Sequence, residues 1–137
     1  MKTLFVVPEI RLDSAPYHFP FWAGNLAAII QKKKGQVGVL DLNAMRARYG
    51  GKQVPNKIIQ EEIASEKWDL VGIGGLTTTY SRIKELAPLI RKNSPDSLFV
   101  GGGGWSTYNP HEILELIPEL DLLVLGEGEE TFSELYD

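Results

Sequence analysis

The chain contains no cysteine. It therefore has no disulfide, no thiol nucleophile, no zinc knuckle and no thiolate-held iron–sulfur cluster of its own. This fits a reducing compartment, and we expect a cytoplasmic location. A second absence is a long apolar run: no segment approaches the roughly 18 residues that a membrane span needs, so we expect no membrane partner. The short apolar N-terminus ends at Pro8 and Glu9 without a cleavage region, which indicates a strand and not a signal peptide.

Basic charge is also scarce. The chain has 14 basic and 18 acidic residues and a net charge of −4. Its one basic cluster, residues 32–34, lies where a helix is expected to end, a position that favours cations. We therefore expect no nucleic-acid partner. The chain has only two histidines, His18 and His111, so hydrolytic chemistry is poorly supported.

Apolar runs of strand length alternate with segments of helical spacing along the chain. Continuous apolar strands are typical of a parallel sheet that is buried on both faces. The pattern predicts an α/β, doubly wound, Rossmann/flavodoxin-like fold with a five-stranded parallel sheet, order 2-1-3-4-5, and helices on both faces. The strands are expected at residues 3–8, 36–41, 69–74, 97–101 and 121–125, and the helices near residues 22–34, 55–66 and 80–91 and from Pro110 and Glu129.

The length of 137 residues fits a single domain, residues 1–137. Because the chain stops at Asp137, soon after its last helix begins, we expect an N-terminal fragment of a longer protein. Residues 46–53 are polar with a glycine pair and are interpreted as an exposed loop.

Four loops should meet at the carboxyl edge of this sheet, where doubly wound folds bind ligands: residues 9–21, 75–79, 101–108 and 126–128. The four glycines 101–104 directly follow a buried strand, so either a strained turn forms there or a ligand comes close to bare backbone. The threonines 77–79 can cap a helix or offer hydroxyls to a ligand. Glu127, between two glycines, is a candidate acceptor for ligand hydroxyls.

The usual nucleotide motifs are missing. No G-x-G-x-x-G follows the first strand and no Walker lysine follows a glycine loop. A phosphorelay receiver is disfavoured because Glu9 stands alone and Gly74 and Gly75 end the third strand. The first loop instead carries Tyr17, His18, Phe19, Phe21 and Trp22, which form either a wall for a hydrophobic ligand or a lid on the core.

Three segments, taken together and in order, carry a resemblance. They are Gly72-Ile-Gly-Gly-Leu-Thr-Thr-Thr, then Gly102-Gly103-x-x-x-Thr107-x-x-Pro110, and then the stretch from Asp121 through Gly126-Glu-Gly-Glu-Glu to Thr131. They resemble the N-terminal cobalamin-binding domain of radical S-adenosylmethionine enzymes. The resemblance implies that the sheet rim holds the corrin of cobalamin while its nucleotide tail enters a slot beside the glycine-rich strand ends. Gly102 and Gly103 would supply the missing side chains that such a slot requires.

The resemblance also implies a set of binding residues. It is made of the third-strand end, the four-glycine stretch and the acidic loop: Gly74, Gly75, Leu76, Thr77, Thr78, Gly102, Gly103, Gly104, Thr107, Glu127 and Gly128. No catalytic residue and no metal ligand is expected in this chain. The [4Fe-4S] cluster and S-adenosylmethionine would belong to a C-terminal radical domain of the same protein, which is absent from this sequence.

The sequence departs from the related methionine-synthase-type domains at their D-x-H-x-x-G motif. If Gly24 takes the place of that motif's glycine, Phe21 replaces the cobalt-binding histidine and Phe19 the aspartate. The resemblance therefore implies cobalt without a protein ligand from this motif, with His18 as the alternative ligand. Gly74 also stands where those domains have serine, although Leu76 and Thr77 are kept.

Two further functions remain open on the sequence. A cofactor-free α/β domain would use the aromatic loop and the acidic glycine loop as docking surfaces. A flavin or sugar-nucleotide binder would use the same fold and the same rim.

Overall fold

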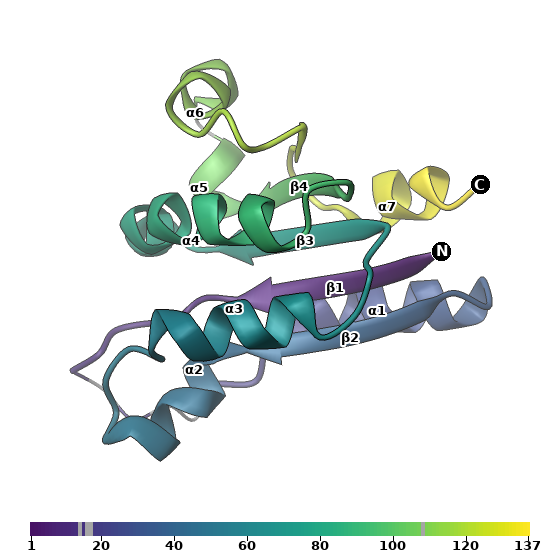
Figure 1. Cartoon of the computed structure of the whole chain (residues 1–137). Helices are drawn as coiled ribbons and strands as arrows, with labels where there is room; N and C mark the ends of the chain where they lie inside the picture. The colour runs from purple at the N-terminus through teal and green to yellow at the C-terminus, as the bar shows by residue number, and fades with distance from the viewer. Residues whose placement is uncertain (14, 16–17, 108) are drawn as a thin grey trace.

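The computed structural model describes the chain except for Ser14, Pro16, Tyr17, Tyr108 and the side chain of Thr77. Its five strands form one parallel sheet in the order β2-β1-β3-β4-β5 (Figure 1). The predicted fold and strand order are therefore confirmed. The strands are β1 Lys2–Val7, β2 Gln36–Asp41, β3 Leu70–Gly75, β4 Leu98–Gly103 and β5 Leu122–Val124.

Helices cover both faces of the sheet, as predicted. The residues buried with α1 and α7 form one core cluster, and those buried with α3, α4 and α6 form the other. The longer helices are α1 Phe21–Lys32, α3 Asn56–Ala64, α4 Tyr80–Asn93, α6 Pro110–Leu116 and α7 Glu129–Leu135. Shorter turns are α2 Leu42–Met45, η1 Arg46–Tyr49, η2 Thr77–Thr79 and α5 Gly104–Thr107. None of the described helices is long and apolar enough to cross a membrane.

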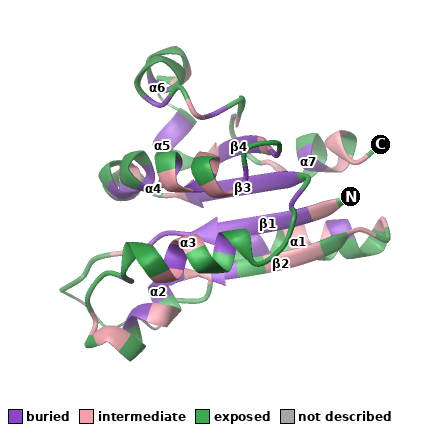
Figure 2. Cartoon of the chain, viewed as in Figure 1, coloured by how far each residue is buried: buried purple, intermediate pink, exposed green. Residues whose placement is uncertain are grey.

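The two core clusters arise because successive side chains along each strand point to opposite faces of the sheet. On β3, Leu70 lies in the cluster with α1, whereas Val71 and Ile73 lie in the cluster with α3 and α4. Phe5 on β1 and Phe99 on β4 are fully buried on opposite faces. Figure 2 shows the central strands buried along most of their length. A sheet covered in this way leaves its carboxyl edge as the place where several loops converge.

Most of residues 46–53 are exposed, as predicted, but the stretch is not simply a loop and its first residue is buried. The first four of these residues form η1, and the Arg46 side chain is fully buried. Its guanidinium donates hydrogen bonds to the carbonyls of Ile10 (3.2 Å), Arg11 (3.2 Å) and Gly51 (2.9 Å). The polar residue type suggested that the Arg46 side chain lies in solvent. Backbone carbonyls from the first loop and from nearby Gly51 instead replace water around the guanidinium.

The glycine-rich stretch is also more ordered than the expected loop of residues 101–108. Gly101–Gly103 continue β4, and the next four residues form α5. Trp105 explains this order, because its ring is buried and its Nε1 donates to the Gly102 carbonyl at 2.6 Å. The Ser106 hydroxyl donates to the Gly103 carbonyl at 3.0 Å. Side chains of α5 thus hydrogen-bond to the backbone carbonyls at the end of β4 and fix its position.

Candidate functional site

A cleft of about 740 Å³ opens at the carboxyl edge of β1, β3 and β4, between α1 and α7. In this strand order β1 leads to β2 on one side and to β3 on the other, so the cleft lies at the point where the direction of winding reverses. Its volume is within the range of sites for small molecules and cofactors. The cleft thus lies at the edge of the sheet where the sequence analysis expected the four loops to meet.

The floor of the cleft is bare backbone at one strand pair. Gly74 on β3 and Gly102 on β4 are Cα partners. A Cβ on Gly102 would meet nothing closer than the carbonyl oxygen and Cβ of Val124, at 3.6 and 3.7 Å, which is ordinary contact distance. A Cβ on Gly74 would lie 3.1 Å from the indole of Trp22 on α1. Gly74 thus accommodates the tryptophan, and Gly102 leaves the cleft open.

The next two glycines have different roles. Gly103 has a φ of +106°, and a Cβ there would lie 2.7 Å from the Gly75 carbonyl oxygen. Its missing side chain allows β3 and β4 to stay paired at their ends, where Gly75 is its Cα partner. A Cβ on Gly104 would meet nothing within 4 Å. Gly104 therefore lies at the open mouth of the cleft.

Most residues of the expected binding set line this cleft. They are Gly74, Gly75, Leu76, Gly102, Gly103, Gly104, Glu127 and Gly128. Thr78 and Thr107 are exposed and are not among the lining residues; the Thr107 hydroxyl donates to the Gly103 carbonyl at 3.2 Å. The side chain of Thr77 lies outside the described part of the chain.

The walls of the cleft are apolar and were largely missed as site residues. Phe5 on β1 lies edge-on to Trp22, with ring centroids 5.7 Å apart, and 5.5 Å from the ring of Phe132 on α7. The continuous apolar run of the first strand predicted Phe5 only as a core residue, whereas Trp22 was already among the aromatic residues expected to form a wall or a lid. Both are core residues that also border the cleft. The further apolar wall residues are Val7, Leu26, Val100 and Val124.

Two exposed aromatic side chains stand at the mouth. Phe19 and Phe21 are 67% and 72% exposed, and their rings lie 5.0 Å apart, edge to face. The Phe19 ring lies over Gly24, where a Cβ would approach it to 3.3 Å. Phe19, Phe21 and His18 all line the cleft. Of the two alternatives for the aromatic loop, a wall is the one this placement favours, while Tyr17 lies outside the described residues.

A buried ion pair holds the start of the first loop. The Glu9 carboxylate accepts hydrogen bonds from Arg82 Nε at 2.7 Å and from the Val54 amide at 3.1 Å. Both charged side chains are less than a tenth exposed. Burial is the largest single influence and disfavours the charged form of Arg82, but the hydrogen bonds and negative charges of Glu9 and Glu85 together outweigh it, so the pKa of Arg82 is raised above the ordinary value. Glu9 is thus a structural partner of α4 and not a free acid at the rim.

The next residue of this loop, Ile10, is held by Asn43 on α2. The Asn43 Oδ1 accepts from the Ile10 amide at 2.9 Å and from Arg46 Nε at 3.0 Å. The Asn43 side chain is only 1% exposed and borders the cleft. Its Nδ2 has no hydrogen-bond partner among the described residues. The two anchors place Ile10 and Arg11 against the cleft.

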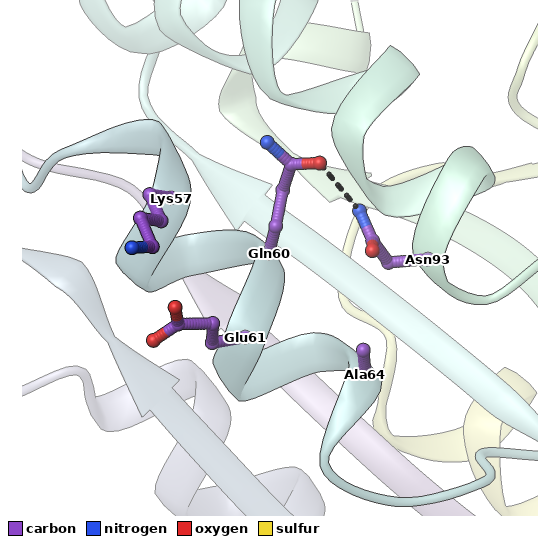
Figure 3. A pocket seen from close by; sticks show the side chains of 5 residues that line it. All are labelled: Lys57, Gln60, Glu61, Ala64 and Asn93. Atoms are coloured by element: carbon purple, nitrogen blue, oxygen red, sulfur yellow. Dashed lines mark hydrogen bonds between the residues drawn. The ribbon is translucent and has the colours of Figure 1, made fainter.

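Three side chains that could bind a metal ion border the cleft: His18, Glu127 and Glu129. In the described part of the chain, however, no cluster of three or more His, Asp or Glu side chains could hold one. A second, shallower depression of about 290 Å³ lies between α3 and α4, on the other face of the sheet (Figure 3). Asn93 Nδ2 donates to Gln60 Oε1 across it at 3.3 Å. Its mixed, solvated lining of Lys57, Gln60, Glu61, Ala64 and Asn93 brings no set of groups together around a ligand.

The fold and the cleft define a class: a doubly wound α/β domain with a cleft of cofactor size at its switch point, over bare strand ends. Comparison with known families identifies that class more narrowly. Residues 10–136 match the family described as the B12 binding domain, and the chain belongs to this family. The expected cobalamin-binding class is therefore confirmed.

The relatives of known name are longer proteins. The chain is 28% identical over 138 aligned positions to an anaerobic magnesium-protoporphyrin IX monomethyl ester cyclase of Rubrivivax gelatinosus, covering 98% of the chain and 24% of the relative. It is 36% identical over 66 residues to the enzyme of the same name from Synechocystis sp., covering 48% of the chain and 13% of that relative. The chain thus spans about a quarter or less of the relatives that it matches.

Solved structures share the fold. The radical S-adenosylmethionine methyltransferase TsrM from Kitasatospora setae, solved with cobalamin and a [4Fe-4S] cluster, has a TM-score of 0.80 at 23% identity, over 98% of this chain and 25% of TsrM. The cobalamin-dependent S-adenosylmethionine radical enzyme OxsB has a TM-score of 0.68 at 18% identity, over 98% of this chain and 18% of OxsB. The domain is similar to modules found in cobalamin-dependent radical enzymes.

Proposed function

We propose that this chain binds cobalamin in the cleft between α1 and α7, with the nucleotide tail over Gly102 and the corrin on the rim outside β3 and β4. The observation that supports this most directly is the open space at Gly102, where a side chain would enter a cleft walled by aromatic and aliphatic groups. A flat heteroaromatic tail fits bare backbone on one side and apolar rings on the other.

The residues present fit the polar parts of the cofactor as well. Glu127, exposed between Gly126 and Gly128 at the mouth, can accept hydrogen bonds from the ribose hydroxyls of the tail. Leu76 is 57% exposed beside the cleft and offers an apolar contact to the corrin. We keep Thr77, Thr78 and Thr107 in the proposed set as rim residues that would meet a corrin larger than the cleft itself.

We propose that the chain supplies no ligand to cobalt from the first loop. Phe19 and Phe21, at the positions of the aspartate and histidine of the D-x-H-x-x-G motif, have no atom that binds a metal. Their exposed rings can instead cover the lower face of the corrin and exclude water from it. Bound cobalamin would supply the organometallic centre for methyl transfer or for a radical reaction.

For the whole protein, we propose a cytoplasmic radical S-adenosylmethionine enzyme in which residues 1–137 are the N-terminal module. The [4Fe-4S] cluster and S-adenosylmethionine would lie in a C-terminal domain, because this chain has no cysteine to hold a cluster. The names of the relatives suggest either ring formation on a magnesium porphyrin ester or methyl transfer. The longer lengths of those relatives support such a second domain.

Cofactor titration tests the binding proposal. The 137-residue chain is incubated with hydroxocobalamin and desalted, and a corrin absorbance that stays with the protein in stoichiometric amount is the expected result. Parallel samples receive flavin mononucleotide or a uridine diphosphate sugar. Retention of one of these instead of cobalamin would overturn the proposal in favour of a flavin or sugar-nucleotide binder, and retention of none, also by a chain extended beyond Asp137, would favour a docking domain.

A further inference from the structure

Among the described residues at the cleft, Asn43 is the one whose side chain has a buried polar atom without a hydrogen-bond partner. Its Nδ2 is buried and has no partner in the described structure, although the residue borders the cleft. The other such atom, the Tyr80 hydroxyl, belongs to a residue that does not line the cleft. A buried donor without an acceptor is destabilising, and most native proteins avoid it.

The orientation of this amide is fixed by its neighbours. The Ile10 amide and Arg46 Nε are both donors, at 2.9 and 3.0 Å, so only the oxygen of Asn43 can face them. A flipped amide would place its NH₂ group against two N–H groups. The nitrogen is therefore the part of the side chain that remains for the cleft.

We infer that Asn43 is a cofactor-binding residue whose Nδ2 donates a hydrogen bond to an oxygen acceptor of bound cobalamin, and this inference rests on the proposed function. Cobalamin carries two kinds of acceptor: the carbonyls of its corrin amide side chains and, on its nucleotide tail, the oxygens of the phosphate and the ribose. Either acceptor would satisfy the donor that the ligand-free domain leaves unpaired. The Oδ1 of the same residue accepts a hydrogen bond from the Ile10 amide. One side chain would therefore both bind the cofactor and fix the position of the first loop.

The substitution Asn43→Asp separates the two halves of this side chain. The Asp oxygen keeps the bonds from Ile10 and Arg46, and the second oxygen replaces the donor with an acceptor. We expect the dissociation constant for hydroxocobalamin to rise about tenfold or more. We also expect the melting temperature of the ligand-free variant to be unchanged or higher, because an unpaired donor is gone and a carboxylate lies beside Arg46.

Opposite changes in affinity and stability are the signature of a ligand contact. A purely structural role would lower both together, as we expect for Asn43→Leu, which removes the Ile10 and Arg46 bonds too. Asn93→Asp is the matched control, because that amide lies between α3 and α4 (Figure 3), and it should leave cobalamin affinity unchanged.

Titration with cobinamide, which lacks the nucleotide tail, distinguishes the two acceptors. If Asn43→Asp weakens cobinamide and cobalamin equally, the acceptor is a corrin amide. If it weakens only cobalamin, the acceptor is on the tail. Wild-type binding with an unchanged affinity in Asn43→Asp would overturn the role of Asn43 alone, whereas a wild-type chain that binds no corrinoid would overturn the proposed function and this inference together.

Discussion

Glu9 and Arg82 form a bidentate ion pair at the end of β1: Arg82 Nε lies 2.7 Å from Glu9 Oε2, and Arg82 Nη2 lies 3.0 Å from Glu9 Oε1. The two residues are 73 positions apart in the sequence. The pair joins the exit of β1 to the first turns of α4. It therefore sets where the first loop leaves the sheet and turns toward the cleft.

Removing the Arg82 guanidinium should lower the stability of the domain. Arg82→Met leaves the carboxylate of Glu9, only 1% exposed, without its cation, and we expect a loss of about 3–5 kcal/mol in the free energy of unfolding. Urea unfolding measures this loss. Adding Glu9→Gln to the variant should recover part of it. Glu85→Gln is the control, since the Glu85 side chain is 62% exposed, and its effect should stay below about 1 kcal/mol. Equal effects of the two single variants would contradict the assigned role.

Blocking the cleft should weaken binding without unfolding the domain. In Gly102→Val the Cβ has ordinary contact distances, and the two methyl groups enter the space that we assign to the nucleotide tail. We expect the dissociation constant for cobalamin to rise about tenfold or more, which corresponds to about 1.4 kcal/mol. A titration that shows wild-type affinity would count against the tail position.

The neighbouring residue provides the contrast. In Gly101→Val the new side chain lies on the other face of β4, where its Cβ would be 2.8 Å from the Trp105 ring and 2.9 Å from Leu123. We expect overpacking to cost about 1–3 kcal/mol in unfolding free energy. The two valine variants thus separate loss of binding from loss of stability within one strand.

Asp121 makes the link between β4 and α4 dependent on pH. Its Oδ2 accepts from the Phe99 amide at 2.8 Å and from Arg91 at 2.7 Å. Burial is the largest single influence and raises the pKa of Asp121, but the hydrogen bonds from Phe99 and Arg91 and the positive charge of Arg91 together outweigh it and hold this pKa below its ordinary value of 3.8. Because the native state binds this proton less readily than the unfolded chain, the stabilisation is complete above that value and is lost as the pH falls below it.

The substitution Asp121→Asn tests this direction. Its urea midpoint should lie below that of the wild type at pH 7, and the difference should shrink as the pH approaches 3. Asp96→Asn, at an exposed position, should follow the wild type throughout. A difference between Asp121→Asn and wild type that stays constant with pH would mean that the charge of Asp121 contributes nothing.

The cobalt should have no nitrogen ligand from the first loop. Electron paramagnetic resonance of bound cob(II)alamin should show no axial nitrogen splitting, in the wild type and in His18→Ala alike. His18 borders the cleft, so a splitting that disappears in His18→Ala would establish it as the lower ligand and refute the proposed arrangement. Ligand-free thermal unfolding of both proteins confirms that the substitution leaves the fold intact.

Local patterns predicted the fold well because each strand and helix has a recognisable residue pattern within a short segment of the sequence. The continuous apolar run that ends at Val7 and the helix start at Pro110 depend on burial and on backbone geometry alone. Part of the site could be predicted for the same reason, since Gly102 and Gly104 follow directly on a strand. The roles of Gly74, which makes room for Trp22 of α1, and of Gly103, which allows close pairing with Gly75 of β3, could not be predicted, because these neighbours are distant in the sequence.

The sequence by itself determined the order of the elements, the parallel sheet and the glycine-rich edge, since these depend on residue type and short-range spacing. Only the tertiary structure decided that Arg46 is buried, that Glu9 pairs with Arg82, and that the amide of Asn43 is left with an unpaired donor beside the cleft. The physical reason is that hydrogen bonds and ion pairs of buried polar groups depend on which distant segments come within about 3 Å, and a linear pattern carries no such distance.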